Sequence, residues 1–330
     1  MKHDYTAVIP VAGTGTRLRP HTYTYPKVLL TVGDKPILGH ILDKLKENNF
    51  KKICLVIGYL GDKVRQYVSS NYPEFDVSYA VQEEQKGLGH AIWLTKDYVK
   101  GPIFIILGDT IIEADLPSFL KGDCDKIGVK KVSDPSRFGV VKVKNGYIEH
   151  MVEKPEKFVS DLAIVGLYSF KNSALLFNSL SELAKTGKTT KGEMQLTDAM
   201  ALMIKKGHKI KPVNTEGWFD CGKPETLLAT NRHILSRKKA IKYPKGSFFV
   251  IKPCYISAKA KISNSIIGPN VSVGDGSVIE NSIISDSIIN ENAVIKNANL
   301  DKSLIGPSAY VSGRIDSINI GENSEIKLSE

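Results

Sequence analysis

The sequence predicts an α/β domain with a Rossmann-like mixed sheet, followed by a parallel β-helix built from hexapeptide repeats. Over the first ~240 residues, short apolar runs alternate with longer amphipathic segments, which is the pattern of an α/β sheet. From about residue 250 the chain becomes rich in Ile, Val, Ser, Asn and Gly, and branched residues recur every five or six positions. With 330 residues the chain is long enough for two domains. We place them at 1–240 and 241–330, joined by a linker over Lys238–Pro244.

The first half of the α/β domain is expected to alternate strands with helices. Apolar runs predict strands over residues 7–11, 52–57, 77–81 and 103–107, and helical spacing predicts helices over residues 37–48, 62–70 and 89–98. In open parallel sheets, ligands bind beyond the carboxyl ends of the strands. The loops that follow the first and last of these strands are therefore expected to face one pocket.

From about residue 126 the pattern becomes more antiparallel. Strands are predicted over residues 129–132, 139–143, 147–152 and 163–170, followed by helices over 173–184 and 194–206. A strand over 209–214 and a helix over 225–236 complete the domain.

The C-terminal repeat has a period of 16 or 17 residues. Ile256, Val273, Ile289 and Ile305 mark this period, and a glycine follows the branched residue in Ile267-Gly, Val273-Gly and Ile305-Gly. Further branched residues fall between them at Ile262, Ile267, Ile279, Ile284, Ile295 and Leu300. The spacing predicts a parallel β-helix with one branched residue per face turned inward. Irregular strands of a sandwich are the alternative, and the repeated glycine argues against them.

The distribution of charge points to an anionic substrate. The formal net charge is +10, yet residues from Tyr243 onward hold 8 Lys and Arg against 9 Asp and Glu, so the basic excess lies in the first 242 residues. Most of that excess is explained by lysines that keep the surface soluble. Nucleic acid is a poorer interpretation, because no basic run is interleaved with aromatic residues. We therefore expect a small anionic substrate and no nucleic acid.

The composition is that of an ordinary globular protein, with 42% hydrophobic and 24% charged residues. No apolar run approaches the ~20 residues that span a bilayer, and the first residues lack the apolar core of a signal peptide. The four cysteines, Cys54, Cys124, Cys221 and Cys254, are scattered without a Cys-x-x-Cys pair. We expect no membrane partner, no disulfide framework or zinc site, and a reducing cytoplasm.

A glycine loop follows the first predicted strand, in Val11-Ala-Gly-Thr-Gly-Thr-Arg17-Leu-Arg-Pro, and Lys27 lies ten residues after Arg17. Glycines let backbone N–H groups approach an anion closely, and the two cations add fixed positive charge. The loop is neither Gly-x-Gly-x-x-Gly, because residue 18 is Leu, nor a Walker loop, because Gly-Lys-Ser/Thr is absent. The combination suits a triphosphate.

These residues resemble the signature of the sugar-1-phosphate nucleotidyltransferases, Gly-x-Gly-Thr-Arg-Leu-x-Pro followed by Pro-Lys. The resemblance covers about residues 5–235. The appended repeat is similar to the left-handed β-helix of the long form of the glucose-1-phosphate thymidylyltransferases. The resemblance implies transfer of a nucleoside monophosphate from a nucleoside triphosphate, dTTP or UTP, to a sugar-1-phosphate, glucose-1-phosphate in the first place. It also implies a homo-oligomer, with a trimer formed through the β-helix as one arrangement.

The resemblance assigns the catalytic and metal-binding residues. Arg17 would hold the leaving phosphates, Lys27 the α-phosphate and Lys154 the sugar phosphate. Asp109, in Leu-Gly-Asp-Thr, and Asp220, in Gly-Trp-Phe-Asp-Cys-Gly, match the two aspartates that bind Mg²⁺ in the family. Taken alone, an aspartate at the end of a strand is more often a turn residue or a helix cap.

The resemblance also assigns the binding residues. Gln82 and Gly87 would bind the base, and Glu153, with the backbone of Gly139 and Ile164, would bind the sugar. The remaining substrate-binding positions are Val11, Gly13, Gly15, Thr16 and Trp218. His90 is expected to be structural, and Thr197 and Asp198 are assigned no chemistry.

Four other functions stay open at the level of sequence. A same-fold transferase with another base or sugar, such as GTP with mannose-1-phosphate, fits the glycine loop equally well. A phosphocholine cytidylyltransferase is disfavoured by the sugar-pocket segments and Trp218. A non-catalytic subunit that senses nucleotide sugars is disfavoured because Arg17, Lys27 and both aspartates are present. A bifunctional acyltransferase is disfavoured because the last histidine is His233, so the repeat has no histidine base. The base, the sugar, feedback inhibition, the oligomeric state and a regulatory role of the β-helix are not settled by the sequence.

Overall fold

The computed structural model describes residues 4–187, 189–238, 243–313 and 318–327. These residues form two compact units that do not follow chain order. Unit 1 takes residues up to Gly13 and Ile41–Trp218, and unit 2 takes Thr14–His40 and Phe219 onward. Each unit has its own hydrophobic core. Residues 239–242 of the predicted linker lie outside the described residues.

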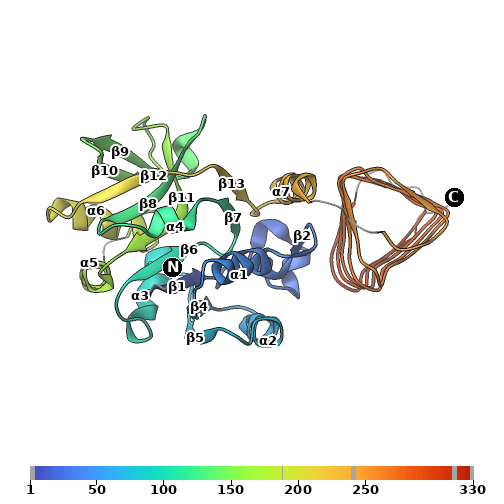
Figure 1. The fold of residues 1–330 in the computed structure, drawn as a ribbon, viewed down its shortest axis with the longest axis horizontal. Helices are drawn as coiled ribbons and strands as arrows, with labels where there is room; N and C mark the ends of the chain where they lie inside the picture. Colours follow the sequence, from blue (N-terminus) through green and yellow to red (C-terminus); the bar gives the residue numbers. More distant parts are fainter. Residues whose placement is uncertain (1–3, 188, 239–242, 314–317, 328–330) are drawn as a thin grey trace. The chain divides into compact units, whose positions relative to one another are not determined.

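Unit 1 is built on a nine-stranded mixed sheet (Figure 1). Seven strands follow the order β10-β9-β11-β6-β1-β4-β5, and the other two branch off it, because β8 pairs with β11 and β12 pairs with β8. Its parallel half consists of β1 (Thr6–Pro10), β4 (Lys52–Ile57), β5 (Asp76–Val81) and β6 (Ile103–Ile106). The carboxyl ends of these four strands meet at one edge, as the sequence predicted.

The second half of the sheet begins with β11, which runs antiparallel to β6, β8 and β9. Its strands are β8 (Asp125–Lys131), β9 (Gly139–Lys144), β10 (Tyr147–Glu153), β11 (Leu162–Phe170) and β12 (Ile210–Asn214). The predicted change from parallel to antiparallel pairing is therefore confirmed, and it makes the sheet mixed.

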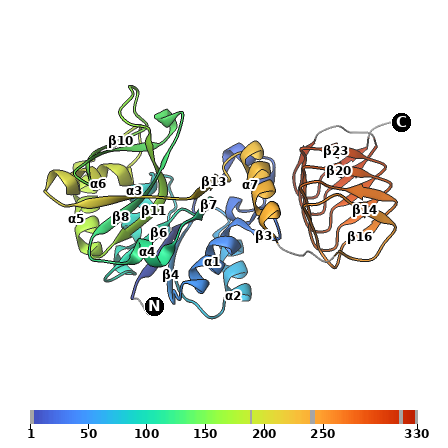
Figure 2. The ribbon, with the colours of Figure 1, turned by 45° about the horizontal axis from the view of Figure 1, so that its top comes forward.

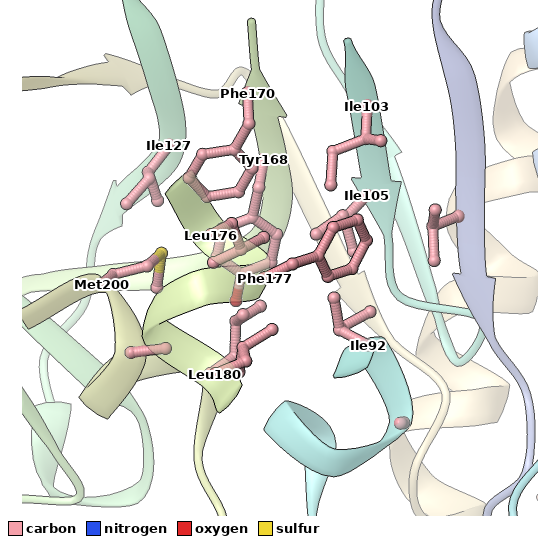
Figure 3. Packing of buried hydrophobic residues seen from close by; sticks show 14 of the residues in the cluster. Ile92, Ile103, Ile105, Ile127, Tyr168, Phe170, Leu176, Phe177, Leu180 and Met200 are labelled. Atoms are coloured by element: carbon pink, nitrogen blue, oxygen red, sulfur yellow. The ribbon is translucent and has the colours of Figure 1, made fainter. Parts of the chain in front are cut away.

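Helices cover both faces of this sheet. Side chains alternate along β6, so Ile103 and Ile105 point to one face, where α3 (Leu88–Trp93), α5 (Ser173–Thr186) and α6 (Leu196–Lys205) pack (Figure 3). Phe104 points to the other face, and its ring lies 5.3 Å from that of Phe50 and 6.1 Å from that of Phe119 on α4 (Leu116–Leu120). The remaining helices are α1 (Ile37–Glu47) and α2 (Gly61–Asn71). None of the helices in the described ranges is both long and apolar enough to cross a membrane.

Two predicted boundaries in this unit were wrong, for tertiary reasons. The helix predicted over 89–98 is α3 followed by a 3₁₀ turn over Leu94–Asp97. Strand β8 begins at Asp125, four residues before its predicted start. The Asp125 carboxylate accepts hydrogen bonds from the Lys171 N–H (2.7 Å) and from His208 (2.7 Å). These distant partners satisfy a buried charge and extend the strand.

The C-terminal part of unit 2 is a β-helix with three parallel sheets, seen end-on as a triangle in Figure 1 and from the side in Figure 2. The sheets are β14-β17-β20-β23 (Phe248–Val250, Ser265–Ile267, Ile283–Ser285, Asn299–Asp301), β15-β18-β21-β24-β26 (Cys254–Ile256, Val271–Val273, Ile288–Ile289, Leu304–Ile305, Asn319–Ile320) and β16-β19-β22-β25-β27 (Lys261–Ser263, Val278–Glu280, Val294–Lys296, Tyr310–Ser312, Glu325–Lys327). Every branched residue that the repeat placed inward is at most 8% exposed. The predicted β-helix and its register are confirmed.

Polar residues define the corners and the stacking of the coils. Asn264, Asn281 and Asn297 occupy one corner in left-handed backbone conformation, and the amide of Asn281 donates to Asn297 Oδ1 (3.1 Å). Asparagine tolerates this conformation better than other residues with side chains. Two buried serines at equivalent positions of consecutive coils link these coils, because Ser265 Oγ accepts a hydrogen bond from the Ser282 N–H (3.0 Å).

A buried asparagine on α7 (Pro224–Arg237) ties the parts of unit 2 together. Asn231 is fully buried. Its Oδ1 accepts from the Gly33 N–H (2.7 Å) and from Ser272 Oγ (2.8 Å), and its Nδ2 donates to the Asn270 carbonyl (3.1 Å). One amide therefore joins the N-terminal segment, a helix and the first coils of the β-helix.

A second contact within unit 2 joins the N-terminal segment to the last described coil. A Cβ placed on Gly321 would lie 3.3 Å from Pro20 Cβ, so the two backbones approach closely. The buried His21 ring hydrogen-bonds to Asn319 through Nε2.

We predict that Asn231→Ala lowers the free energy of unfolding by about 2 kcal/mol or more, because it leaves the Gly33 N–H, the Ser272 hydroxyl and the Asn270 carbonyl without their partner. The thermal midpoint should fall by roughly 5 °C. The matched control is Ser236→Ala on the same helix, an exposed residue bonded only to the His233 carbonyl. Equal midpoints for the two variants would contradict the prediction.

Candidate active site

Three loops of unit 1 meet at the carboxyl ends of the parallel strands. The Gly108 N–H, at the turn before Asp109, donates to the Pro10 carbonyl (3.3 Å), and the Val11 N–H donates to the Val56 carbonyl (2.8 Å). The Gln85 amide donates to the Ala12 carbonyl (3.0 Å). The loops that carry Val11, Gln82 and Asp109 are thereby held side by side, as the order of the strands predicted.

The loop that follows β5, residues 82–87, is fixed at both ends. The Gln82 N–H donates to the Ile57 carbonyl (2.8 Å), and the nearly buried Gln82 side chain donates through Nε2 to the Gly87 carbonyl (3.2 Å). Gly87 has a φ of +96°, and a Cβ there would lie 2.7 Å from the Met194 carbonyl oxygen. Only glycine fits this position, so the chain at residue 87 packs directly on Met194.

His90, in the first turn of α3, contacts the same amide. Its Nδ1 lies 3.1 Å from Gln82 Nε2, and its ring stacks on Trp93 at 6.1 Å. Burial lowers the pKa of His90, and the nearby Lys86 lowers this pKa further. The ring is therefore neutral at pH 7, as an acceptor at Nδ1 requires.

A second group of residues surrounds the side chain of Glu153, at the end of β10. A Cβ placed on Gly139, its partner on β9, would lie 2.9 Å from Glu153 Oε2, 3.1 Å from Ile164 Cδ1 and 3.1 Å from Thr197 Oγ1. Thr197 donates its hydroxyl proton to Glu153 Oε2 (2.7 Å). We call Gly139, Glu153, Ile164 and Thr197 the Glu153 cluster. The structure thus brings together three residues predicted for the sugar and adds Thr197.

Lys154 turns the chain at the edge of this cluster. Its φ is +43°, a left-handed conformation that is strained for a lysine. Its N–H donates to the Phe138 carbonyl (3.0 Å), and its Nζ lies 3.7 Å from Glu153 Oε1. Trp218 packs edge-on against the Phe138 ring at 4.7 Å. The cluster therefore has a cation on one side and an aromatic pair beside it.

A bulge in β11 connects this cluster to the turn that bears Asp109. The pairing of β11 with β8 shifts register between Ile164 and Tyr168. Gly166 in the bulge has a φ of +83°, and a Cβ there would lie 2.5 Å from Leu107 Cδ1. The Leu107 N–H donates to the Gly166 carbonyl (3.1 Å). Because residue 166 is glycine, the chain before Asp109 packs directly on the strand that carries Ile164.

Unit 2 contains the rest of the glycine loop and the first predicted lysine. Gly15 has a φ of +64°, and a Cβ there would lie 3.0 Å from Lys27 Cβ and 3.0 Å from Thr22 Cγ2. Thr22 Oγ1 donates to the Gly15 carbonyl (2.8 Å). Arg17 is exposed within the 3₁₀ turn Thr16–Leu18 and is anchored by the fully buried Leu18. The fold thus packs the glycine loop against the backbone that carries Lys27.

Asp220, also in unit 2, is held in place by its own turn. Its Oδ1 accepts from the Gly222 N–H (3.0 Å) and its Oδ2 from Thr226 Oγ1 (3.3 Å). In unit 1, Asp109 is half-buried and accepts from Thr110 Oγ1 (3.1 Å). Each of the two is a half-buried carboxylate with oxygen atoms of the kind that Mg²⁺ prefers, so the chemistry of each side chain fits this ion.

Sequence reasoning left two residues of this site without a role. Thr197 and His90 each touch a predicted substrate-binding side chain, Glu153 and Gln82. The sequence could have indicated both residues, because each lies in the first turn of a helix, Thr197 in α6 and His90 in α3.

Gly13 and Thr16 lie on the exposed part of the glycine loop, and no atom comes within 4 Å of a Cβ placed on Gly13.

Comparisons with known proteins assign both parts of the chain to known families. The family described as nucleotidyl transferase matches residues 6–237, and the family described as GlmU-like, C-terminal hexapeptide matches residues 243–325. The bifunctional protein GlmU of Methanococcus maripaludis strain S2 is 35% identical over 83% of this chain, which spans 61% of that protein's length. The low-salt glycan biosynthesis nucleotidyltransferase Agl11 of Haloferax volcanii is 31% identical over 97% of this chain and 99% of its own. A UDP-glucose pyrophosphorylase solved with UDP-glucose superposes with a TM-score of 0.60 at 26% identity, covering 71% of this chain and 99% of that one.

We predict that Gly15→Ala lowers the unfolding midpoint and that Gly13→Ala does not. Alanine at a φ of +64° costs about 1 kcal/mol, and its Cβ meets Lys27 and Thr22. Gly13 has no positive φ and no neighbour in the way, so the same substitution there is tolerated. Thermal unfolding of the two variants, two residues apart in one loop, checks the prediction, and equal shifts would contradict it.

Proposed function

Because the chain belongs to the nucleotidyl transferase family, we propose that it transfers a nucleoside monophosphate from UTP or dTTP to glucose-1-phosphate. The observation that carries the proposal is the Glu153 cluster, which lies on the same sheet as the 82–87 loop and next to a strained lysine. A carboxylate fixed by Thr197 is suited to accept hydrogen bonds from sugar hydroxyls. The products are a nucleotide sugar and pyrophosphate.

The reaction needs no nucleophile from the protein. A phosphate oxygen of the sugar-1-phosphate forms a bond to the α-phosphorus of the triphosphate. The bond from that phosphorus to the bridging oxygen of the β-phosphate breaks, and pyrophosphate leaves in line with both electrons of the bond. Catalysis therefore consists of positioning two anions and neutralising their charge.

The cations of the site divide this task. Arg17, exposed on the glycine loop, holds the leaving β- and γ-phosphates, and the open backbone of Gly13 lets N–H groups of the loop approach them. Lys27 acts on the α-phosphate. Lys154 holds the attacking phosphate while its neighbour Glu153 binds the sugar ring. Each cation thus lowers the repulsion between the two substrates.

Mg²⁺ is the metal that we propose for Asp109 and Asp220. When bound, it would offset the negative charge of the triphosphate and of the departing pyrophosphate. The chain's own contribution is to orient the two carboxylates, through Thr110 for Asp109 and through Gly222 and Thr226 for Asp220.

The 82–87 loop supports uracil or thymine as the base. Gln82, next to the backbone of Gly87, offers a side-chain amide that can pair with the edge of a base. The solved relative that was crystallised with UDP-glucose supports the same base class and supports glucose as the sugar. The resemblance to long-form thymidylyltransferases supports thymine.

The β-helix is proposed to assemble the enzyme and not to transfer acyl groups, because it contains no histidine. Its β14-β17-β20 face carries an outward apolar ladder in which Phe249 pairs with Ile266 and Ile266 with Ile283. Phe249 is 78% exposed and Ile283 is 50% exposed. A continuous apolar ladder is suited to pack against the same ladder of another copy.

Pyrophosphate release tests the proposed reaction. The purified protein is incubated with Mg²⁺, glucose-1-phosphate and each of UTP, dTTP, GTP, CTP and ATP in turn. Release with UTP or dTTP is expected. No release with any of the five, followed by failure of a wider panel of sugar phosphates, would overturn the proposal in favour of a nucleotide-sugar sensor.

We predict that Lys154→Gln raises the KM for the sugar phosphate at least tenfold while the KM for the triphosphate changes less than threefold, since it removes one charge from a phosphate contact. Lys157→Gln is the matched control, an exposed lysine in the same loop. Steady-state kinetics with each substrate varied in turn separates the two constants. A larger effect on the triphosphate would contradict the assignment of Lys154.

We predict that the double variant Phe249→Ser/Ile283→Ser shifts the protein to a monomer of 36.3 kDa, because it interrupts the apolar ladder. Light scattering coupled to size exclusion measures the mass. The control is Phe158→Ser, which removes a phenylalanine that is 77% exposed in unit 1. A wild-type monomer, or a double variant of unchanged mass, would contradict the prediction.

A further inference from the structure

The side-chain amide of Gln82 has only one orientation that satisfies its neighbours. The Gly87 carbonyl oxygen, 3.2 Å away, can only accept a hydrogen bond, so the NH₂ group of the amide must face it. The same nitrogen lies 3.1 Å from His90 Nδ1. Both protons of the NH₂ group are therefore used within the protein, and His90 Nδ1 must act as an acceptor with its proton on Nε2.

This orientation turns the amide oxygen outward. Within the described residues Gln82 Oε1 has no hydrogen-bond partner, and although the residue is only 4% exposed this oxygen is not fully enclosed. The site thus presents an acceptor next to Gly87. An amide turned the other way would present a donor instead.

An acceptor at this position distinguishes uracil and thymine from cytosine. Uracil and thymine carry a donor at N3, whereas N3 of cytosine is an acceptor. When cytosine binds, its N3 and Gln82 Oε1 would be two acceptors buried against each other, and neither would have a hydrogen bond. This loss penalises the binding of cytosine strongly.

We propose that His90 is a positioning residue that sets the base specificity of this site, by holding the Gln82 amide with its oxygen toward N3 of uracil or thymine. The inference rests on the proposed nucleotidyl transfer and extends it to the choice between UTP or dTTP and CTP. His90 acts through Gln82 and is not required to touch the substrate. Its ring is held by the stack on Trp93, whose indole N–H donates to Ser181 Oγ (3.0 Å).

Two substitutions separate this role from simple packing. His90→Phe keeps an aromatic ring on Trp93 but removes the acceptor. His90→Asn loses the stack but places its Oδ1 near the position of Nδ1. If His90 only filled space, phenylalanine would be the better replacement, and if it orients Gln82, asparagine would be.

The experiment measures kcat/KM for UTP, dTTP and CTP with wild type and both variants, using Mg²⁺ and glucose-1-phosphate. The specificity is expressed as kcat/KM for the better of UTP and dTTP divided by kcat/KM for CTP. We expect His90→Phe to lower this ratio by about tenfold, mainly through the KM for the triphosphate, and to leave the KM for the sugar phosphate unchanged. We expect His90→Asn to keep the ratio within about threefold. An unchanged ratio in His90→Phe, or an equal loss in both variants, would overturn the inference.

The outcomes also separate this inference from the proposed function. Absence of turnover by wild type with every triphosphate counts against the function alone. The ratio of dissociation constants for UTP and CTP, measured by calorimetry, then decides the role of His90 by the same criteria. Thermal unfolding verifies that each variant folds, and His90→Leu replaces His90→Phe if that variant does not.

Discussion

Hydrogen bonds between loops at one edge of the nine-stranded sheet are the constraint on which the site of unit 1 depends. The turn before Asp109 is bonded to Pro10, and the 82–87 loop is bonded to Ala12 and to Ile57. These bonds reach from strand to strand, so the positions of the loops follow from the pairing of β1 with β4 and β6. The bulge at Gly166 extends the same chain of contacts to β11 and the Glu153 cluster. A rigid sheet thereby positions groups that lie on flexible connections.

The sequence predicted those elements that have a strong repeating pattern. Strand β4 occupies its predicted residues 52–57, because five of its six residues are buried and apolar. The β-helix was predicted down to single inward residues, since each coil repeats the same spacing and every repeat must bury its branched side chains. The 3₁₀ turns between residues 16 and 29 were not predicted, because three residues are too few to show a period.

The candidate site was predicted unevenly, and the reason is physical. Asp109, the glycine loop and Gln82 follow strands, so the sheet edge that gathers them can be expected from the pattern alone. The Glu153 cluster depended on the resemblance, because Glu153 and Thr197 lie 44 residues apart on a strand and a helix. A hydrogen bond between side chains of different elements leaves no period in the sequence. The same holds for the contact of Gln82 with His90, which needs the left-handed turn at Gly87 to form.

The contacts inside unit 2 have a consequence for how such chains evolve. Pro20, three residues after Arg17, lies against Gly321, and Asn231 bonds both to Gly33 and to the first coils of the repeat. Recombination at the linker would replace the repeat with that of a related gene. Pro20 and Asn231 would then lose the residues of the repeat that they contact. A working chimera therefore requires matched changes on the catalytic side of the junction. Residues 14–40 and 219–237 of the first family segment belong to the same structural unit as the second segment, so the boundary between the families is not a boundary between structural units.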